Sequence, residues 1–305
     1  MLNKVISLVF FLILLVLAGC SEVSPYVEET SAEERTITLN LDITTRAEAD
    51  NSPDNFHLWI FNGEKLLKYI NSNPSWNPVN ANGIDLKATL EAEIDVKDVT
   101  KIQLYLLLNT TVEGPSGLSP DEIKNLTFTL PEQPYSDDNK VPMSVMETLD
   151  ITSGKWYYDV PIETKRSVAK LGLYFTKGSE TASLTIDKIT LGKIPDIGYL
   201  FGTPEENQMN YIQIKDLLTE TKVIETSYEE GLPANDSDDF WDASVENQFT
   251  EVSHSYLLEN MNGGVIHQVN VTDNTDRYYI QIEYTLNGIK SQQTIYLSKM
   301  ERNQY

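Results

Sequence analysis

The sequence predicts an all-β protein, and three observations support this class. Apolar and polar residues alternate in many short segments, which is the period of a strand with one buried face. Asn-Gly pairs at Asn62-Gly63 and Asn287-Gly288 stand between such segments and supply the positive φ angles of a tight hairpin turn. Helical patterns are few and short. Many short strands joined by turns are typical of β-sandwiches.

The first half of the chain begins its alternation at Thr36–Thr44, where four aliphatic residues share one face. Further strands are expected at Phe56–Phe61, Lys65–Ile70, 84–94, 101–108 and Trp156–Ile162. A short helix is expected after Ser119, because a capping Ser is followed there by a Pro and two acidic residues. Residues 127–155 are rich in Pro, Asp, Ser and Thr and are expected to form a long loop.

The second half repeats the strand pattern around an irregular middle. Strands are expected at Arg166–Phe175, Thr181–Leu191, Glu251–Leu258, Arg277–Leu286 and Gln292–Leu297. Residues 193–250 look irregular, with weak helical signals at Ile212–Leu218 and Asp239–Val245. A cut at the charged stretch Glu163–Arg166 divides the folded part into two domains, 36–165 and 166–305.

The N-terminus indicates the compartment. Val5–Ala18 is an apolar run of about 14 residues, which suits a signal peptide and is short for a membrane span. It ends in Leu17–Cys20, small residues before a Cys, which is the pattern of a lipobox. Residues 1–19 would then be a lipoprotein signal peptide, and Cys20 would carry the lipid. The alternative is a simple membrane anchor with a chance Cys; lipidation is favoured because Cys20 is the only Cys in the chain.

A polar segment follows the lipidation site. Residues 20–35 contain Ser, Pro and several Glu, which is typical of a flexible tether between a lipid and a folded body. The formal net charge of −23 argues against nucleic-acid binding, which needs a basic face. It also argues against docking on anionic lipid through basic residues.

No catalytic or metal-binding motif is present, so the sequence predicts no catalytic residue, no metal site, no cofactor and no enzyme activity. The three His residues are far apart, and His57 is expected to be a hydrogen-bonded strand residue, with His254 at a strand start and His267 in a loop. An acidic group could in principle hold calcium, but a solvated loop is favoured: Asp236, Asp238 and Asp239. Three Trp residues could stack on sugars, although core packing is favoured: Trp76, Trp156 and Trp241.

Four local features together resemble the fimbrillin superfamily, the lipoprotein-derived subunits of the type V pili of Bacteroidales. They are the lipobox with its following strand, the segment Thr45–Glu48 ahead of Phe56–Gly63, the pair Lys140–Ser144 and Arg166–Leu171, and Tyr256–Gly263. The pair is the most specific of these, and it is similar to the family's signature at the junction of its two domains. Val145 departs from the pattern, since a Gly is usual there.

The resemblance implies two tandem transthyretin-like β-sandwich domains in a structural or adhesive subunit of a cell-surface fimbrium. In the family's polymerising subunits a protease cuts after an Arg and removes the first strand, and a strand of another subunit fills the groove. Here Thr36–Thr44 would leave after a cut at Arg46, with Arg35 as the alternative site. Cutting and not cutting both remain open.

The same resemblance implies the partners and the location. The partners would be other fimbrial subunits, the outer membrane through Cys20, and host or bacterial surface ligands. An uncut chain would be a lipid-anchored accessory or anchor subunit at the cell surface. The rival interpretations are a surface glycan-binding lipoprotein and, less favoured, an enzyme acting on polysaccharide. Stalk, anchor or tip position, the donor strand and the adhesion ligand stay open.

Overall fold

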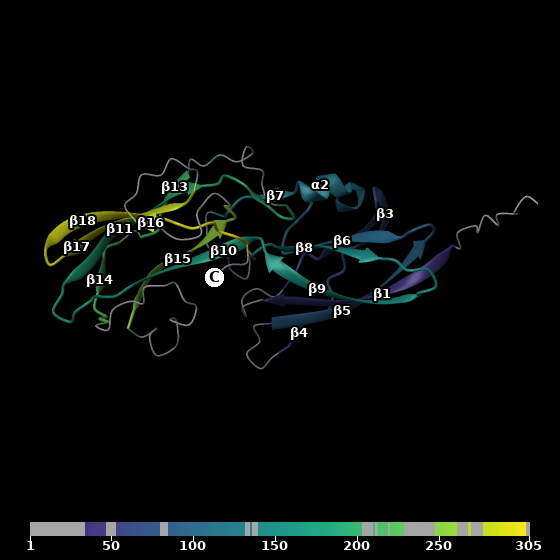
Figure 1. Cartoon of the computed structure of the whole chain (residues 1–305), viewed down its shortest axis with the longest axis horizontal. Helices are drawn as coiled ribbons and strands as arrows, with labels where there is room; N and C mark the ends of the chain where they lie inside the picture. Colours follow the sequence, from purple (N-terminus) through teal and green to yellow (C-terminus); the bar gives the residue numbers. More distant parts are fainter. Residues whose placement is uncertain are drawn as a thin grey trace, which may run out of the picture.

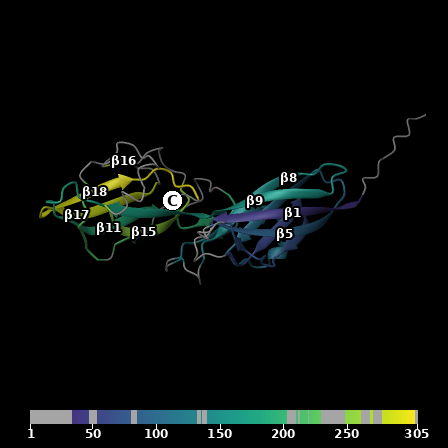
Figure 2. The same cartoon turned by 90° about the horizontal axis from the view of Figure 1, so that it is seen from below.

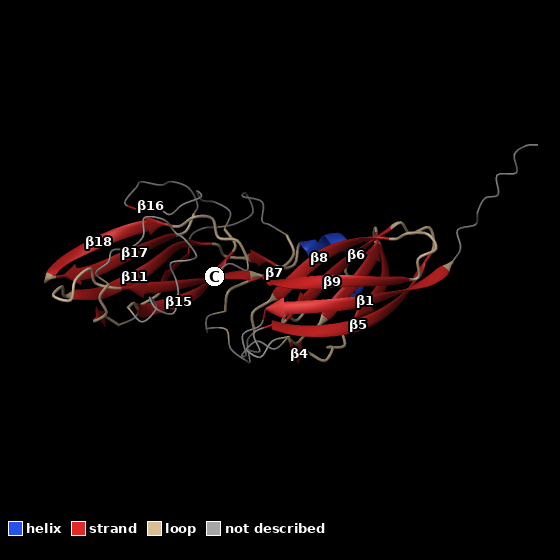
Figure 3. Cartoon of the chain, turned by 60° about the horizontal axis from the view of Figure 1, so that its bottom comes forward, coloured by secondary structure: helices blue, strands red, loops and turns tan. Residues whose placement is uncertain are grey.

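The structure is a computed structural model that describes residues 34–46, 53–79, 85–131, 135, 140–202, 210, 213–218, 220–228, 248–260, 268–269 and 277–302. It is almost entirely β, as the sequence predicted. The strands gather in two bodies that follow one another along the long axis (Figures 1 and 2). Figure 3 shows that the helical turns lie on one side of the body that contains β1.

Eight strands form the first body, and they fold over into two facing layers. The first layer contains β9 (Tyr157–Arg166), β1 (Arg35–Arg46), β5 (Asp85–Val96) and β4 (Asn77–Pro78), in that order. The second contains β3 (Lys65–Ile70), β2 (His57–Asn62), β6 (Lys101–Leu108) and β8 (Met143–Asp150). Strands β8 and β9 join the layers through two residue pairs alone, Met143–Arg166 and Ser144–Lys165.

The main core lies between these layers. Alternate side chains of β1, β5 and β9 meet alternate side chains of β2, β6 and β8 in one apolar cluster. Its members on β1 are Ile37, Leu39, Leu41 and Ile43, each fully buried. The period-two pattern of the sequence is therefore the direct cause of this packing, because alternate residues of a strand face the same side.

A second core covers the outer face of the β2–β6 layer. Trp59 and Tyr105 of that face pack with Ile123 of the helix α2 (Pro120–Lys124) and with Leu200. The Trp59 indole Nε1 donates to the Pro115 carbonyl, 2.7 Å away, in the 3₁₀ turn η2 (Pro115–Gly117). Burial on both faces explains the continuous apolar run of β2, which a half-exposed strand would not need.

The second body pairs a two-stranded sheet with a larger one. The small sheet contains β10 (Val168–Phe175) and β15 (Thr250–Leu258). The larger sheet contains β13 (Gln213–Asp216), β11 (Leu184–Ile194), β17 (Tyr279–Leu286), β18 (Ile289–Tyr296) and β16 (Gln268–Val269), and β14 (Lys222–Ile224) also pairs with β11. Aliphatic side chains of both sheets form one cluster between them.

A segment of the second half of the chain packs on the first body. The short strand β12 (Gly198–Tyr199) pairs with β7 (Thr127–Phe128), which comes from the first half. Leu200 follows β12, is 1% exposed, and completes the core on the outer face of β2 and β6. The division at 165/166 therefore stays a prediction, and the two bodies share at least one core across it.

Three expectations about local structure are wrong. Strand β8 lies inside the expected loop 127–155, because it is held by eight residue pairs with β6 rather than by its own weak alternation. Within the expected helix Ile212–Leu218, the structure shows the strand β13, which β11 recruits by pairing. The first hairpin turns at Gly63 and Glu64, so that Asn62 stays in β2. The segment Asp239–Val245 lies outside the described residues.

Other expectations are confirmed. Ser119 and Glu122 form a reciprocal capping box at the start of α2. The second hairpin turns at Asn287-Gly288, where both residues have positive φ, 49° and 80°. Most expected strands appear within a few residues of their predicted bounds, and β1 extends past both ends of Thr36–Thr44.

Candidate functional site: the first strand and its slot

Strand β1 is an interior strand that is paired along both sides. It pairs with β5 in antiparallel fashion over all twelve residues from Arg35 to Arg46. On its other side it pairs with β9 in parallel fashion from Thr38 to Thr45. It is therefore not an edge strand of the sheet. Removal of β1 would open a slot between two strands, which we call the β5–β9 slot.

The inward face of β1 forms part of the apolar core of the first body. Its four aliphatic side chains are fully buried among residues of both layers. Burial of one such side chain contributes roughly 1.5–3 kcal/mol, so the four contribute at most about 6–12 kcal/mol. Thr45 continues this face and donates its hydroxyl to the Met143 sulfur at 2.8 Å. An empty β5–β9 slot would therefore expose both backbone groups and a large part of the core.

The outward face of β1 is polar and bonded to both neighbours. The Asn40 amide donates to Asp159 of β9 at 2.9 Å, and the Thr36 hydroxyl donates to Asp95 of β5 at 2.7 Å. Asp42 lies 3.1 Å from the Lys87 ammonium group. Hydrogen bonds from Lys87 and then from Thr89 lower the pKa of the Asp42 carboxyl. These contacts fix the register of β1, since each one joins a specific pair of positions.

The two candidate cleavage residues lie at opposite ends of β1. Arg46 is its last residue and pairs with Asp85 at the start of β5. Arg35 is its first residue; its Nη2 donates to the Thr152 carbonyl at 2.7 Å. A cut after Arg46 would free the whole of β1 from the residues that follow it. A cut after Arg35 would leave all four buried aliphatic side chains covalently attached to the body.

The free side of β9 differs from the β5–β9 slot. The Trp156 carbonyl accepts a hydrogen bond from the Thr38 amide at 2.8 Å, so every second residue from 156 onward directs its backbone toward β1. Pro161 is one of the intervening residues, whose backbone groups face away from β1. Any other residue there would present a free amide on the side of β9 opposite β1. A Pro there removes a donor, which protects a sheet edge against pairing with another chain. The Pro in this segment was a readable signal of such an edge.

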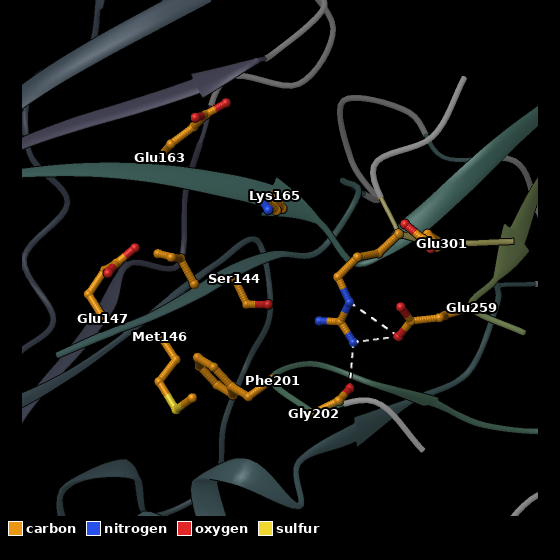
Figure 4. Close-up of a pocket in the computed structure, with 11 residues that line it drawn as sticks. Ser144, Met146, Glu147, Glu163, Lys165, Phe201, Gly202, Glu259 and Glu301 are labelled. Carbon is orange, nitrogen blue, oxygen red and sulfur yellow. Dashed lines mark hydrogen bonds and ion pairs between the residues drawn. The ribbon is translucent and has the colours of Figure 1, made fainter. Parts of the chain in front are cut away.

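The C-terminal segment is tied into the junction between the two bodies. The Arg302 guanidinium lies 2.9 Å from the Glu259 carboxylate, and it also donates to the Leu200 carbonyl at 2.9 Å and the Tyr199 carbonyl at 3.2 Å. Figure 4 shows its further bond to the Gly202 carbonyl. We call this group the Arg302 cluster. Its members are distant in the sequence, and no local pattern marks them.

A cavity of about 700 Å³ opens beside the Arg302 cluster. It is lined by β8 and β9 where they separate, together with Phe201 and Gly202, as Figure 4 shows. The Glu147 and Glu163 carboxylates and the Lys165 ammonium group belong to its wall. Among the described residues, no group of three or more His, Cys, Asp or Glu side chains could hold a metal ion.

The other residues singled out from the sequence lie apart. His57 is a hydrogen-bonded strand residue, as expected, with its Nδ1 2.6 Å from the Tyr69 hydroxyl. His254 lies in β15, 3.0 Å from the Glu251 carboxylate. Outside the described residues lie Cys20, His267, Trp241, Asp236, Asp238 and Asp239. In the part of the chain that the structure describes, no helix is long and apolar enough to cross a membrane.

Comparison with known proteins finds solved structures with a similar fold. No family model matches the chain, and no curated protein matches it. A fimbrial assembly protein from Parabacteroides distasonis ATCC 8503 matches with a TM-score of 0.51 and 8% identity, over 89% of this chain and 89% of that chain.

Two further structures are each described as a "putative cell adhesion protein". The one from Parabacteroides distasonis ATCC 8503 has a TM-score of 0.49 and 15% identity, over 87% of this chain and 85% of that one. The one from Bacteroides eggerthii DSM 20697 has a TM-score of 0.48 and 16% identity, over 89% and 84%. At these identities the first match shows a shared fold alone. The shared fold is the all-β architecture described above.

Proposed function

We propose that this chain is a structural or adhesive subunit of a cell-surface fimbrium, that it is exported as a lipoprotein through Cys20, and that it is assembled by strand exchange after a cut at Arg46. The observation that supports the proposal most is the placement of β1. One strand at the start of the folded chain fills a slot between β5 and β9, and a candidate protease site stands at its end.

The energetics of the β5–β9 slot favour replacement of β1 by a donated strand over an empty slot. Without β1, β5 would lose its neighbour over twelve residues and β9 over eight, and every second residue of these stretches would have unpaired backbone groups. Unpaired backbone groups beside exposed apolar surface are costly, and a donated strand satisfies both. A cut subunit would therefore accept an alternating strand of another subunit, and the result would be a non-covalent polymer.

The accessory or anchor subunit is the second candidate, and two contacts favour it. The Arg302 cluster and the two backbone bonds between Asn260 and Met300, both 2.8 Å, hold the C-terminal segment within its own chain. Donation of the segment after β18 to a neighbour would break these bonds. In an uncut chain, β1 would stay in place and Cys20 would keep the protein on the outer membrane.

The glycan-binding alternative has less support. Its Trp platform would need neighbouring exposed rings, and the two described candidates lie at opposite ends of the first body. Trp76 precedes β4, which pairs with the start of β5, whereas Trp156 lies beside the start of β1, which pairs with the end of β5. No arrangement of described side chains supports an enzyme.

Limited digestion with trypsin tests the assembly proposal. The first cut is expected after Arg46, because the residues that follow it are polar and turn-prone. The cut protein should form oligomers that resist mild detergent, and an added peptide with the sequence of residues 36–46 should compete with their formation. Arg46→Ala should abolish both the cut and the oligomers, whereas Arg35→Ala should leave both unchanged.

One result would separate the two candidates. Cut protein that remains monomeric would reject the polymerising subunit and favour the anchor or accessory subunit. Lipidation is tested apart from assembly: Cys20→Ala should release the protein from the membrane fraction, and its retention there would reject the lipoprotein assignment.

A further inference from the structure

One end of the first body gathers the beginning of β1 and two loops. The loop that precedes β9 is joined to β1 by the bond from Arg35 to the Thr152 carbonyl and by the bond from the Thr38 amide to the Trp156 carbonyl. The loop that precedes β6 is joined to it through the Ile151 amide, which donates to the Thr100 carbonyl at 2.8 Å. We call this end the β1 pole; it lies farthest from the second body along the long axis (Figure 1).

Two aromatic side chains stand exposed at the β1 pole. Trp156 is 49% exposed and Tyr157 is 75% exposed, whereas every other Phe, Tyr and Trp side chain of the described residues is at least partly buried. The Arg35 guanidinium lies 5.8 Å from the Trp156 ring, which holds the ring at the surface. Neighbouring residues of an extended segment face opposite sides, so the two exposed rings flank the start of β9 on its two faces, and Tyr157 shares the outer face with Thr38.

The charges of the β1 pole are largely balanced, although the chain as a whole is strongly acidic. Lys97 lies 3.3 Å from Glu34, and Lys101 lies 3.6 Å from Asp150. Lys155 adds a cation whose Nζ lies 4.4 Å from the Tyr158 ring centre. These pairs leave little net charge at this end, which suits a lipid surface without net charge.

The β1 pole is also the end of the body that the proposed tether joins. Fourteen residues, 20–33, separate the proposed lipid from Glu34, so even a fully extended chain would keep this end of the body within roughly 50 Å of the membrane. Such a short span keeps the local concentration of the membrane surface high, so a weak contact becomes populated. Trp and Tyr prefer the boundary between the acyl chains and the headgroups, because each has an apolar body and a polar tip.

We propose that the β1 pole of the uncut chain rests on the lipid surface, with Trp156 and Tyr157 inserted at the headgroup boundary. The partner is a zwitterionic lipid interface. The inference rests on the proposed anchoring at Cys20, which sets the tether. A subunit held in this way would stand with its long axis away from the membrane and its second body outermost.

The test uses the single cysteine of the chain to supply the tether without cellular lipidation. Protein beginning at Cys20 is coupled through this thiol to a maleimide lipid in vesicles of phosphatidylcholine and phosphatidylethanolamine. Bromine on the acyl chains of these lipids quenches the fluorescence of inserted Trp residues. The proposal predicts quenching by brominated lipid, its loss in Trp156→Phe, and its retention in Trp76→Phe, which removes a Trp at the opposite end of the body.

Two results would overturn the proposal. Equal quenching in the wild type and in Trp156→Phe would show that another part of the protein meets the membrane. A blue shift of Trp156 emission that needs high protein concentration and no lipid would show that a second copy covers the ring. Because the lipid is coupled to Cys20 by a maleimide in this assay, either result is distinct from a failure of lipidation in the cell.

Discussion

The buried ion pair of the Arg302 cluster should be a principal support of the junction. The Arg302 and Glu259 side chains are 15% and 7% exposed, and Arg302 also donates to three backbone carbonyls of residues 199–202. Arg302→Met would keep much of the volume and leave a buried carboxylate without its cation. Such a change costs about 3–5 kcal/mol of unfolding free energy.

A double-mutant cycle measures how much of this cost belongs to the pair. Glu259→Gln should cost about 1–3 kcal/mol, because the amide oxygen can still accept one hydrogen bond. The double variant should lose less than the sum of the two, with a coupling of about 1–3 kcal/mol. Urea unfolding followed by circular dichroism gives all four values, provided that the slope with denaturant is unchanged.

A matched control removes an exposed pair. Lys101→Met breaks the ion pair between Lys101 and Asp150, whose side chains are 62% and 84% exposed respectively. This change should lower the unfolding free energy by less than about 1 kcal/mol. The reasoning is refuted if Arg302→Met costs no more than this control, or if the two single changes at the cluster are additive.

Two further predictions concern the first body. Leu200→Ala should destabilise the first body by about 2–5 kcal/mol and separate one unfolding transition into two in calorimetry, because Leu200 fills a core shared across the junction; a single transition at the wild-type temperature would contradict this. Burial lowers the pKa of His57, partly offset by a backbone hydrogen bond with Thr110, so the folded state favours the neutral ring. Stability from this site is therefore complete above about pH 6.5 and is lost as the pH falls through the lowered pKa; His57→Gln should reduce the loss of stability between pH 7 and pH 5, and an unchanged profile would contradict the assignment.

The sequence predicted those strands that carry their own signal. Strand β1 has one buried and one solvated face, so its alternation is strict and its bounds were nearly correct. Strand β8 keeps only its first two residues buried, and its alternation fades where it separates from β9. Strand β13 is four residues long and is held by β11, so pairing overrides a local pattern that suggested a helix.

The candidate site was predictable in part for a similar reason. Arg46 and Arg35 could be named from the sequence, but choosing between them needs the register, which places them at opposite ends of one strand. The interior position of β1 depends on β9, more than a hundred residues later. Arg302 gave no local signal, because its partners lie 43 and about 100 positions away in the sequence.

The pairing of β1 also determines which strands could take its place. Side chains alternate between core and solvent. A strand that enters one residue out of register would direct toward the core the polar side chains that should occupy the outward positions of Thr38, Asn40 and Asp42. Burial of such polar groups without partners costs several kcal/mol in total. A vacated slot would thus act as a template that tests the order of residues in an incoming segment, and it would accept some segments and reject others without any binding pocket of the usual kind.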